Sequence, residues 1–304
     1  MVQTAISGTI ILYQRQSPIT PPEFIPYYIG RGMFGMGGVT CLYYGFAVLP
    51  IADATALYYT LPIPTAIFAW VFLGESYGGV EVLAAMTGLL GVFCITRPPF
   101  LWPFPSPSHH DPTLDVLPED HSPAEVNLGY VACLCGALLT SMAFITIRRV
   151  GKRTTAWVLT FWHGVSGVGV CGVLMVVLQQ LKMPDSWEHL ALLASVGVFA
   201  LLVQVLVNKG LQLEAAGPGA LMTNLQLVWA YLLQVTFQHK PIIGWCVFGA
   251  VLIVSATAGT FLYNSYRDKH VQSDRSALKR TKSAEMSVLS IEAPQQGDDE
   301  YQQI

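Results

Sequence analysis

Long uncharged stretches alternate along the chain with short polar segments. Seven of them are long enough to cross about 30 Å of hydrocarbon as a helix. A further stretch, 82–96, spans if it extends back across Glu81 to Ser76, whereas 1–14 is too short. None shows the period-two alternation of a β-barrel. This pattern predicts eight full membrane helices and part of a ninth. The uncharged stretches are 1–14, 32–52, 54–74, 82–96, 126–147, 154–181, 190–208, 215–238 and 241–266.

Composition supports an all-α bundle in a lipid bilayer. Only 12% of the 304 residues are charged and 53% are apolar, against about 25% charged in a typical soluble domain. These values argue against a soluble enzyme, a disulfide scaffold and a nucleic-acid binder. The six cysteines lie inside apolar stretches and form no C-x-x-C pair, so we expect neither a metal site nor a cofactor.

Two polar segments divide the chain into four parts. A Pro-rich, acidic linker occupies residues 98–125, and a polar tail that we expect to be disordered occupies 267–304. The membrane parts are then 1–97 and 126–266. Counting Lys and Arg by alternate loops places thirteen of the sixteen on one side, including Arg31, Lys209 and the tail. Because cytoplasmic loops are enriched in Lys and Arg, we expect a cytoplasmic C-terminus and a non-cytoplasmic linker.

The order of the predicted helices indicates an internal repeat. A shift of 165 residues aligns five identical pairs: Gly45 with Gly210, Phe72 with Phe237, Gly79 with Gly244, Val82 with Val247 and Ala85 with Ala250. Five helices follow the linker, while three full helices and a partial one precede it. The pattern predicts a pair of inverted five-helix repeats with ten helices in the complete form, of which this chain lacks one helix and half of another.

Several motifs carry a family resemblance. They are Leu49–Ala56, the prolines Pro62 and Pro64, the segments Ile67–Trp70 and Leu73–Glu75, then Arg97–Leu101, and Gly210–Pro218 in the second half. Together they resemble the EamA domain of drug/metabolite transporters, in particular the subgroup G members of solute carrier family 35, over residues 30–264. The resemblance implies ten helices in two inverted repeats and the transport of organic solutes by alternating access.

Polar residues at membrane depth are the candidate substrate contacts, because each needs a partner or a cavity. Gln204 and Asn208 share one helix face, and Lys209 follows them. Thr223 and Gln226 form a second stripe with Gln234, beside Asn224. Each stripe either lines a water-filled cavity or joins helices through hydrogen bonds. The titratable His163 is expected to be a hydrogen-bonded core residue.

Aromatic and proline residues of the first half supply further candidates. Tyr43, Tyr44, Tyr58 and Tyr59 belong either to an interfacial aromatic belt and its packing or to a substrate vestibule. Pro62 and Pro64 are predicted to kink the middle of a helix, as hinges or as static curvature. Glu75 is expected to pair with Arg15, Arg31 or Arg149 in a structural or gating role.

These patterns favour a multi-pass secondary transporter of a small organic solute. The cationic residues on one side indicate an organic anion as that solute. The alternative is a non-transporting membrane regulator that binds protein partners; an intramembrane enzyme ranks last, since the sequence contains no catalytic motif. Glycines 164–172 could form a homodimer seam, and Tyr301–Ile304 fits the pattern read by sorting adaptors. We expect an integral membrane protein of the plasma membrane or of an endomembrane.

Overall fold

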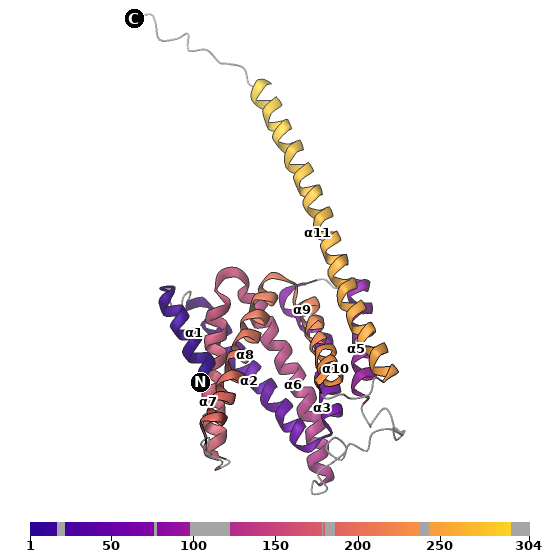
Figure 1. Cartoon of the computed structure of the whole chain (residues 1–304). Helices are drawn as coiled ribbons and strands as arrows, with labels where there is room; N and C mark the ends of the chain where they lie inside the picture. Colours follow the sequence, from indigo (N-terminus) through magenta and orange to yellow (C-terminus); the bar gives the residue numbers. More distant parts are fainter. Residues whose placement is uncertain are drawn as a thin grey trace, which may run out of the picture. The chain divides into compact units, whose positions relative to one another are not determined.

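The chain is helical throughout the part that its computed structural model describes. The described residues are 1–16, 22–75, 78–97, 122–177, 179, 186–237 and 243–292. They contain no strand. Most of the predicted linker and the Tyr301–Ile304 motif lie outside the described residues. The chain divides into two units, Met1–Ala258 and Gly259–Ile304. The first unit contains the membrane bundle (Figure 1).

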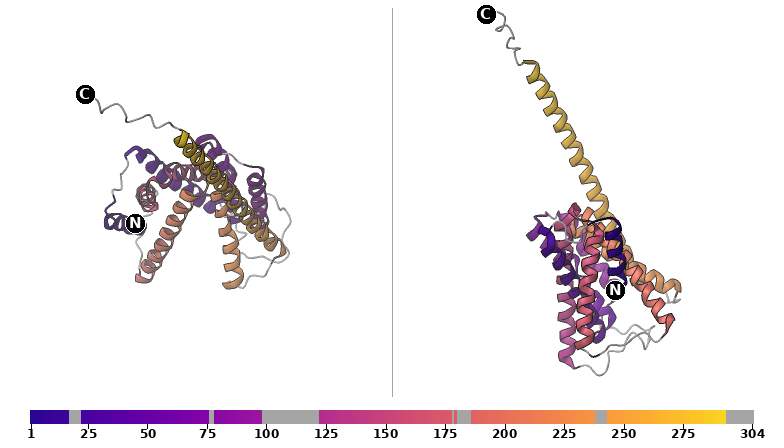
Figure 2. Two further views of the ribbon diagram at one scale, coloured as in Figure 1. Left: turned by 90° about the horizontal axis from the view of Figure 1, so that it is seen from above. Right: turned by 90° about the vertical axis from the view of Figure 1, so that its left-hand side faces the viewer.

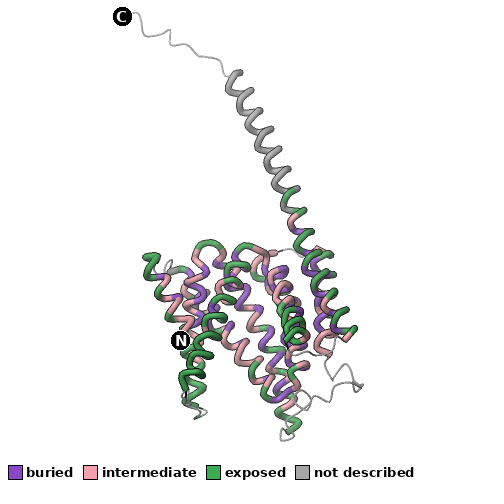
Figure 3. The backbone as a smooth tube through the Cα atoms, in the orientation of Figure 1, coloured by how far each residue is buried: buried purple, intermediate pink, exposed green. Residues whose placement is uncertain are grey.

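Seven described helices or helix pairs are long and apolar enough to span a membrane. They are Ile51–Leu73, Gly79–Thr96, Pro123–Arg153, Ala156–Val177, Trp187–Leu213, Ala216–Phe237 and Gly244–Arg267. Their outer faces expose large apolar side chains, for example Phe199, Leu206 and Trp229, and much of α8 (Trp187–Leu213) is exposed along its length (Figure 3). Lipid would cover these faces, so the predicted polytopic helix bundle is confirmed.

The remaining predicted span is α2 (Ile25–Val48), which is 24 residues long. It does not reach the apolarity of the seven spans, and it contains the charged residue Arg31. The short α1 (Val2–Tyr13) has 12 residues, as expected for a partial helix. The helix α2 begins at Ile25 rather than near residue 32, because Pro26 occupies the first turn, where its missing N–H has no intrahelical role.

The pair α2 and α6 (Pro123–Val150) forms the centre of the first unit, and the two helices run side by side in both Figure 1 and Figure 2. Small residues permit this approach. A Cβ on Gly38 would overlap the Thr140 side chain, and one on Gly136 would lie 3.0 Å from the Gly38 carbonyl oxygen. On the other side, α2 packs against α7 (Ala156–Val177), which also contacts α1.

Two predicted continuous helices are interrupted. The first is divided into α3 (Ile51–Tyr58), α4 (Pro62–Phe68) and the π-helical turn η2 (Ala69–Leu73). Pro62 therefore begins a helix instead of kinking the middle of one, because a first-turn position needs no N–H. The second is divided into α9 (Ala216–Thr223) and α10 (Leu225–Phe237) at Asn224.

The helix boundaries repeat at a spacing of 165 residues, and they support the internal repeat better than the five identical residue pairs do. Ile51 begins α3 and Ala216 begins α9. Gly79 begins α5 (Gly79–Thr96), and Gly244 begins α11 (Gly244–Glu292). The ends of α2 and α8, at Val48 and Leu213, have the same spacing. Four spans separate α2 from α8, so successive crossings would give the two helices opposite directions, as in an inverted repeat.

The second unit covers the tail for which the sequence predicts disorder. Its described backbone continues α11 as a helix to Glu292. Between Tyr266 and Glu292 the sequence has neither glycine nor proline, so nothing there breaks a helix.

Candidate functional site

A buried arginine lies at the junction of α2, α7 and α8. Arg31 is only 3% exposed. The predicted position of Arg31 in a cytoplasmic loop was wrong, because α2 begins six residues earlier at Ile25. A cation at this depth is costly unless polar groups surround it. The structure supplies such groups from two other helices.

The Arg31 guanidinium donates to three side chains, all of them uncharged. Its Nη2 donates to Oε1 of Gln204 at 2.7 Å, and its Nε to Oδ1 of Asn208 at 3.3 Å. Its Nη1 donates to Nδ1 of His163 at 3.2 Å. Among the described residues, no carboxylate pairs with Arg31. The positive charge is therefore buried among dipoles and is not neutralised by a counter-ion.

Hydrogen-bond donors outnumber acceptors in this network. The Gln204 amide nitrogen faces Nε2 of His163 at 3.2 Å, while Arg31 already donates to the other ring nitrogen. A neutral histidine carries a hydrogen on one of its two nitrogens, so one of these two contacts brings donors together. In addition, these hydrogen bonds occupy three of the five N–H groups of Arg31. A group with negative charge and acceptor atoms would therefore match the unused donors of this network.

Further bonds hold the network in place. Asn208 is fully buried, and its amide donates to Oγ1 of Thr160 at 2.9 Å. Gln3 of α1 donates to the Thr160 carbonyl at 3.0 Å. His163 is the hydrogen-bonded core residue that the sequence predicted. Positions fixed by several helices give a site the rigidity that selective binding needs.

One face of α8 continues from this site to the helix end. Gln204, Asn208 and Gln212 are spaced four residues apart and so lie on one stripe. Gln212 is buried and donates to the Thr154 carbonyl at 3.0 Å. The exposed Lys209 lines a surface cleft together with Gln212. The structure thus brings together the predicted residues Gln204 and Asn208 at Arg31, whereas Lys209 is exposed and lines the surface cleft.

The second predicted stripe is not assembled in this way. Gln226 and Gln234 are exposed, because the helix breaks at Asn224 and the regular spacing is lost. Gln226 is therefore not joined to a neighbouring helix in the way that Gln204 and Asn208 are, and its place in a water-filled cavity stays a prediction. Thr223 donates to the Ala220 carbonyl at 2.6 Å within its own helix. Asn224 is fully buried near Gly88 of α5, and neither atom of its amide has a hydrogen-bond partner among the described residues.

The four tyrosines separate into two groups. Tyr43 is 66% exposed on the outer surface of α2, where a belt or packing role fits better than a vestibule. Tyr44 packs against the apolar cluster around Val48. Tyr58 and Tyr59 are buried at the break before α4, with ring centroids 5.7 Å apart. The Tyr58 hydroxyl is 2.8 Å from Oγ1 of Thr140 on α6.

Glu75 joins three elements at one end of the bundle. Its Oε1 accepts from Nε of Arg148 at 2.7 Å, and its Oε2 accepts from the Ala216 backbone N–H at 3.1 Å. The expected partners Arg15, Arg31 and Arg149 were therefore wrong. Gly74 ends η2 in the left-handed conformation, with φ 66°. Glu75 consequently contacts the first residue of α9, where the helix dipole favours an anion.

Family comparison agrees with this architecture. Residues 1–97 and 127–262 match the EamA-like transporter family. The chain belongs to that family. The two matched segments cover both halves of the bundle and leave out the polar segment between them.

Relatives with descriptive names include transporters and membrane proteins. An uncharacterized membrane protein of Saccharomyces cerevisiae is 32% identical over 84% of this chain and 63% of its own length. Solute carrier family 35 member G1 of Homo sapiens is 28% identical over 84% of this chain and 68% of its own. The pseudopaline exporter CntI of Pseudomonas aeruginosa is 23% identical, over 82% and 80% respectively. The chain thus spans about two thirds of the length of the first two relatives.

A solved structure shares the fold. One chain, described as a crystal structure of a protein, superposes with a TM-score of 0.65 at 18% identity. The match covers 86% of this chain and 84% of that chain. Together with the apolar spans, these comparisons establish an integral membrane protein of a transporter family.

Proposed function

We propose that this protein is a secondary transporter of a small organic anion, with Arg31 as the residue that attracts the anionic group. The observation that carries the proposal is a fully enclosed guanidinium with uncharged partners and surplus donors. Arginine forms paired, charge-assisted hydrogen bonds with carboxylates and phosphates. An anion at Arg31 would therefore satisfy both the charge and the free N–H groups.

The competing interpretation is that the network only joins helices. Interhelical hydrogen bonds in membranes contribute about 0.6 kcal/mol each on average, and neutral side chains supply them at much lower cost than a buried cation. Interhelical hydrogen bonding alone therefore does not explain why this position has a guanidinium group and not a neutral amide. Membership of a transporter family supports the transport reading.

Alternating access needs a site that two halves can expose in turn. Arg31 lies on α2, in the first matched segment, and its partners lie on α7 and α8, in the second. A relative movement of the two segments would change the contacts of Arg31 directly. The Glu75 contacts likewise join η2 of the first segment to α6 and α9 of the second, so we assign Glu75 a gating role.

The test is counterflow in proteoliposomes with the full chain. A panel of small organic anions is compared with cations and neutral solutes of similar size. We expect uptake of at least one anion, reduced more than tenfold in Arg31→Gln. Arg149→Gln is the matched control, because it removes the same charge from an exposed position of α6 and should transport normally.

Folding must be checked before the transport result is read. Arg31→Lys keeps the charge but loses the paired donor geometry, so we expect it to fold and to transport with a raised KM. Anion uptake by Arg31→Gln equal to that of the unmodified protein would overturn the assignment of Arg31. Lack of counterflow with every solute would favour the non-transporting regulator.

A further inference from the structure

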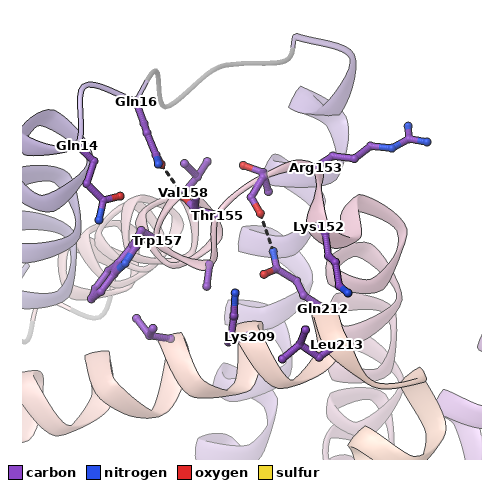
Figure 4. Close-up of a pocket in the computed structure, with 13 residues that line it drawn as sticks. Gln14, Gln16, Lys152, Arg153, Thr155, Trp157, Val158, Lys209, Gln212 and Leu213 are labelled. Atoms are coloured by element: carbon purple, nitrogen blue, oxygen red, sulfur yellow. Dashed lines mark hydrogen bonds between the residues drawn. The ribbon is translucent and has the colours of Figure 1, made fainter. Parts of the chain in front are cut away.

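A surface cleft of about 750 Å³ lies where the end of α1, the start of α7 and the last turns of α8 meet (Figure 4). Gln14 and Gln16 line it from the segment that follows α1, Trp157 from α7, and Lys209 and Gln212 from α8. Arg31 does not line it. The cleft is thus a separate site from the buried network, although Gln212 belongs to the same stripe of α8 as Asn208.

The charged side chains that line the cleft are all basic. Lys152, Arg153 and Lys209 line it, and none of the described lining residues is Asp or Glu. In Figure 4, Lys152 and Lys209 extend toward the Gln212 side chain, whereas Arg153 extends away. The Arg153 guanidinium instead lies over the Phe24 ring, 5.6 Å from its centroid. Two ammonium groups therefore belong to the cleft, and the third cation is occupied elsewhere.

Neutral donors complete the lining. The helix α7 begins at Ala156 within the cleft, so the positive end of its dipole lies there, while the Val158 N–H donates to the Thr155 carbonyl at 3.2 Å. The Thr155 hydroxyl donates to Oε1 of Gln16 at 2.9 Å and connects the residue before α7 to the segment after α1. Two lysines together with a helix N-terminus match an anion with two charges and several oxygens.

We propose that this cleft binds a phosphomonoester group, presented either by a membrane lipid headgroup or by a free phosphate compound. A phosphomonoester carries about −1.5 to −2 charges near pH 7, which two ammonium groups balance, whereas a single carboxylate leaves one of them unpaired. The cleft lies at helix ends, where polar headgroups meet protein, and basic clefts at such positions recognise phosphorylated lipids. Trp157 is suited to the same interfacial depth.

The experiment uses the purified full chain in lipid nanodiscs and measures binding by native mass spectrometry and by the shift in unfolding temperature. In the lipid arm, phosphatidylinositol 4-phosphate in phosphatidylcholine discs is compared with phosphatidylinositol. In the soluble arm, glycerol 3-phosphate is added to phosphatidylcholine discs, with sodium chloride at equal ionic strength as control. We expect saturable binding in at least one arm, and the positive arm identifies the source of the phosphate.

Variants then locate the site. The double variant Lys152→Gln with Lys209→Gln should lose more than tenfold in affinity. Arg153→Gln is the matched control, because its guanidinium lies over Phe24 and away from the cleft; its affinity should change less than threefold. Unfolding temperatures measured without ligand show whether each variant is folded.

Three outcomes would overturn the proposal: no binding in either arm, undiminished binding by the double variant, or a loss in Arg153→Gln equal to that of the double variant. Arg31→Gln separates this proposal from the transport function. If Arg31→Gln loses transport yet binds phosphate normally, both proposals stand. Loss of phosphate binding in Arg31→Gln would place the ligand at the buried network and reject the separate cleft site.

Discussion

Arg31 shows how much a single buried residue depends on its neighbours. Its three partners come from positions 132, 173 and 177 residues away in the sequence. Each partner accepts a hydrogen bond without neutralising the charge. Removing one of them should therefore leave a desolvated donor with no compensation.

The first prediction concerns Asn208. We expect Asn208→Ala to destabilise the protein by about 1–3 kcal/mol, because the Arg31 Nε–H and the Thr160 hydroxyl each lose a partner in a buried environment. The measurement is unfolding in detergent micelles. Gln226→Ala is the control, since that side chain is exposed, and it should change stability by less than about 0.5 kcal/mol. Equal effects of the two substitutions would argue against a stabilising network.

Individual glycines also differ in how closely a neighbouring helix approaches them. A Cβ on Gly91 of α5 would lie 2.7 Å from the Gly249 carbonyl oxygen on α11, whereas one on Gly169 of α7 would meet nothing within 4 Å. The second prediction is that Gly91→Leu destabilises the bundle by about 1–3 kcal/mol, because the added side chain overpacks the contact between the two helices. Gly169→Leu should be neutral or slightly stabilising in the same unfolding measurement. A Gly91→Leu variant as stable as Gly169→Leu would mean that α5 and α11 do not approach closely.

At the scale of helices, the contacts of Glu75 connect the two matched segments at a place separate from the Arg31 network. The Arg148 and Glu75 side chains are 28% and 19% exposed, so solvent screens their pair in part. The backbone contact with Ala216 adds a second connection that does not depend on Arg148.

The third prediction is a coupling between these two side chains. A double-mutant cycle of Glu75→Gln and Arg148→Gln should give a coupling of about 0.5–1 kcal/mol in stability. The same cycle with Arg149→Gln should give none, because Arg149 is exposed and does not contact Glu75. Measuring the transport rate in both cycles tests the gating role of Glu75. Equal coupling energies for Arg148 and Arg149 would contradict a specific interaction between Glu75 and Arg148.

Interrupted helices recur at corresponding places in the two halves. The breaks after Tyr58 and after Thr223 are 165 residues apart, like the helix starts at Ile51 and Ala216. Only the first break has a proline beside it, Pro62. The sequence near Asn224 contains no such signal, which is why periodicity predicted an unbroken polar stripe there. The recurrence therefore belongs to the fold rather than to local sequence.

At the scale of the whole molecule, the crossings predict sidedness. The fourth prediction is that single cysteines at Arg149 and Lys209 react with an impermeant reagent from one side of the membrane, while those at Ile51 and Ser122 react from the other. The helices α6 and α8 end near the first pair, and α3 and α6 begin near the second. The background protein has its six native cysteines replaced. Reaction of Ile51→Cys from the side of Arg149→Cys would contradict the topology.

The sequence by itself was sufficient to predict the membrane class, the positions of the crossings and the repeat offset. These depend on local composition, because a segment in lipid must be apolar and must satisfy its own backbone hydrogen bonds as a helix. The pair Gln204 and Asn208 was also predictable, since their spacing of four residues places them on one face of any helix.

Only the tertiary structure decided which side chains meet. It placed Arg31 inside α2 against His163, paired Glu75 with Arg148, and left Gln226 exposed. These contacts join residues far apart in the chain, so packing between helices determines them and no local pattern records them. The proposed chemistry of this protein rests on such contacts, because a buried charge acquires its meaning from the partners that surround it.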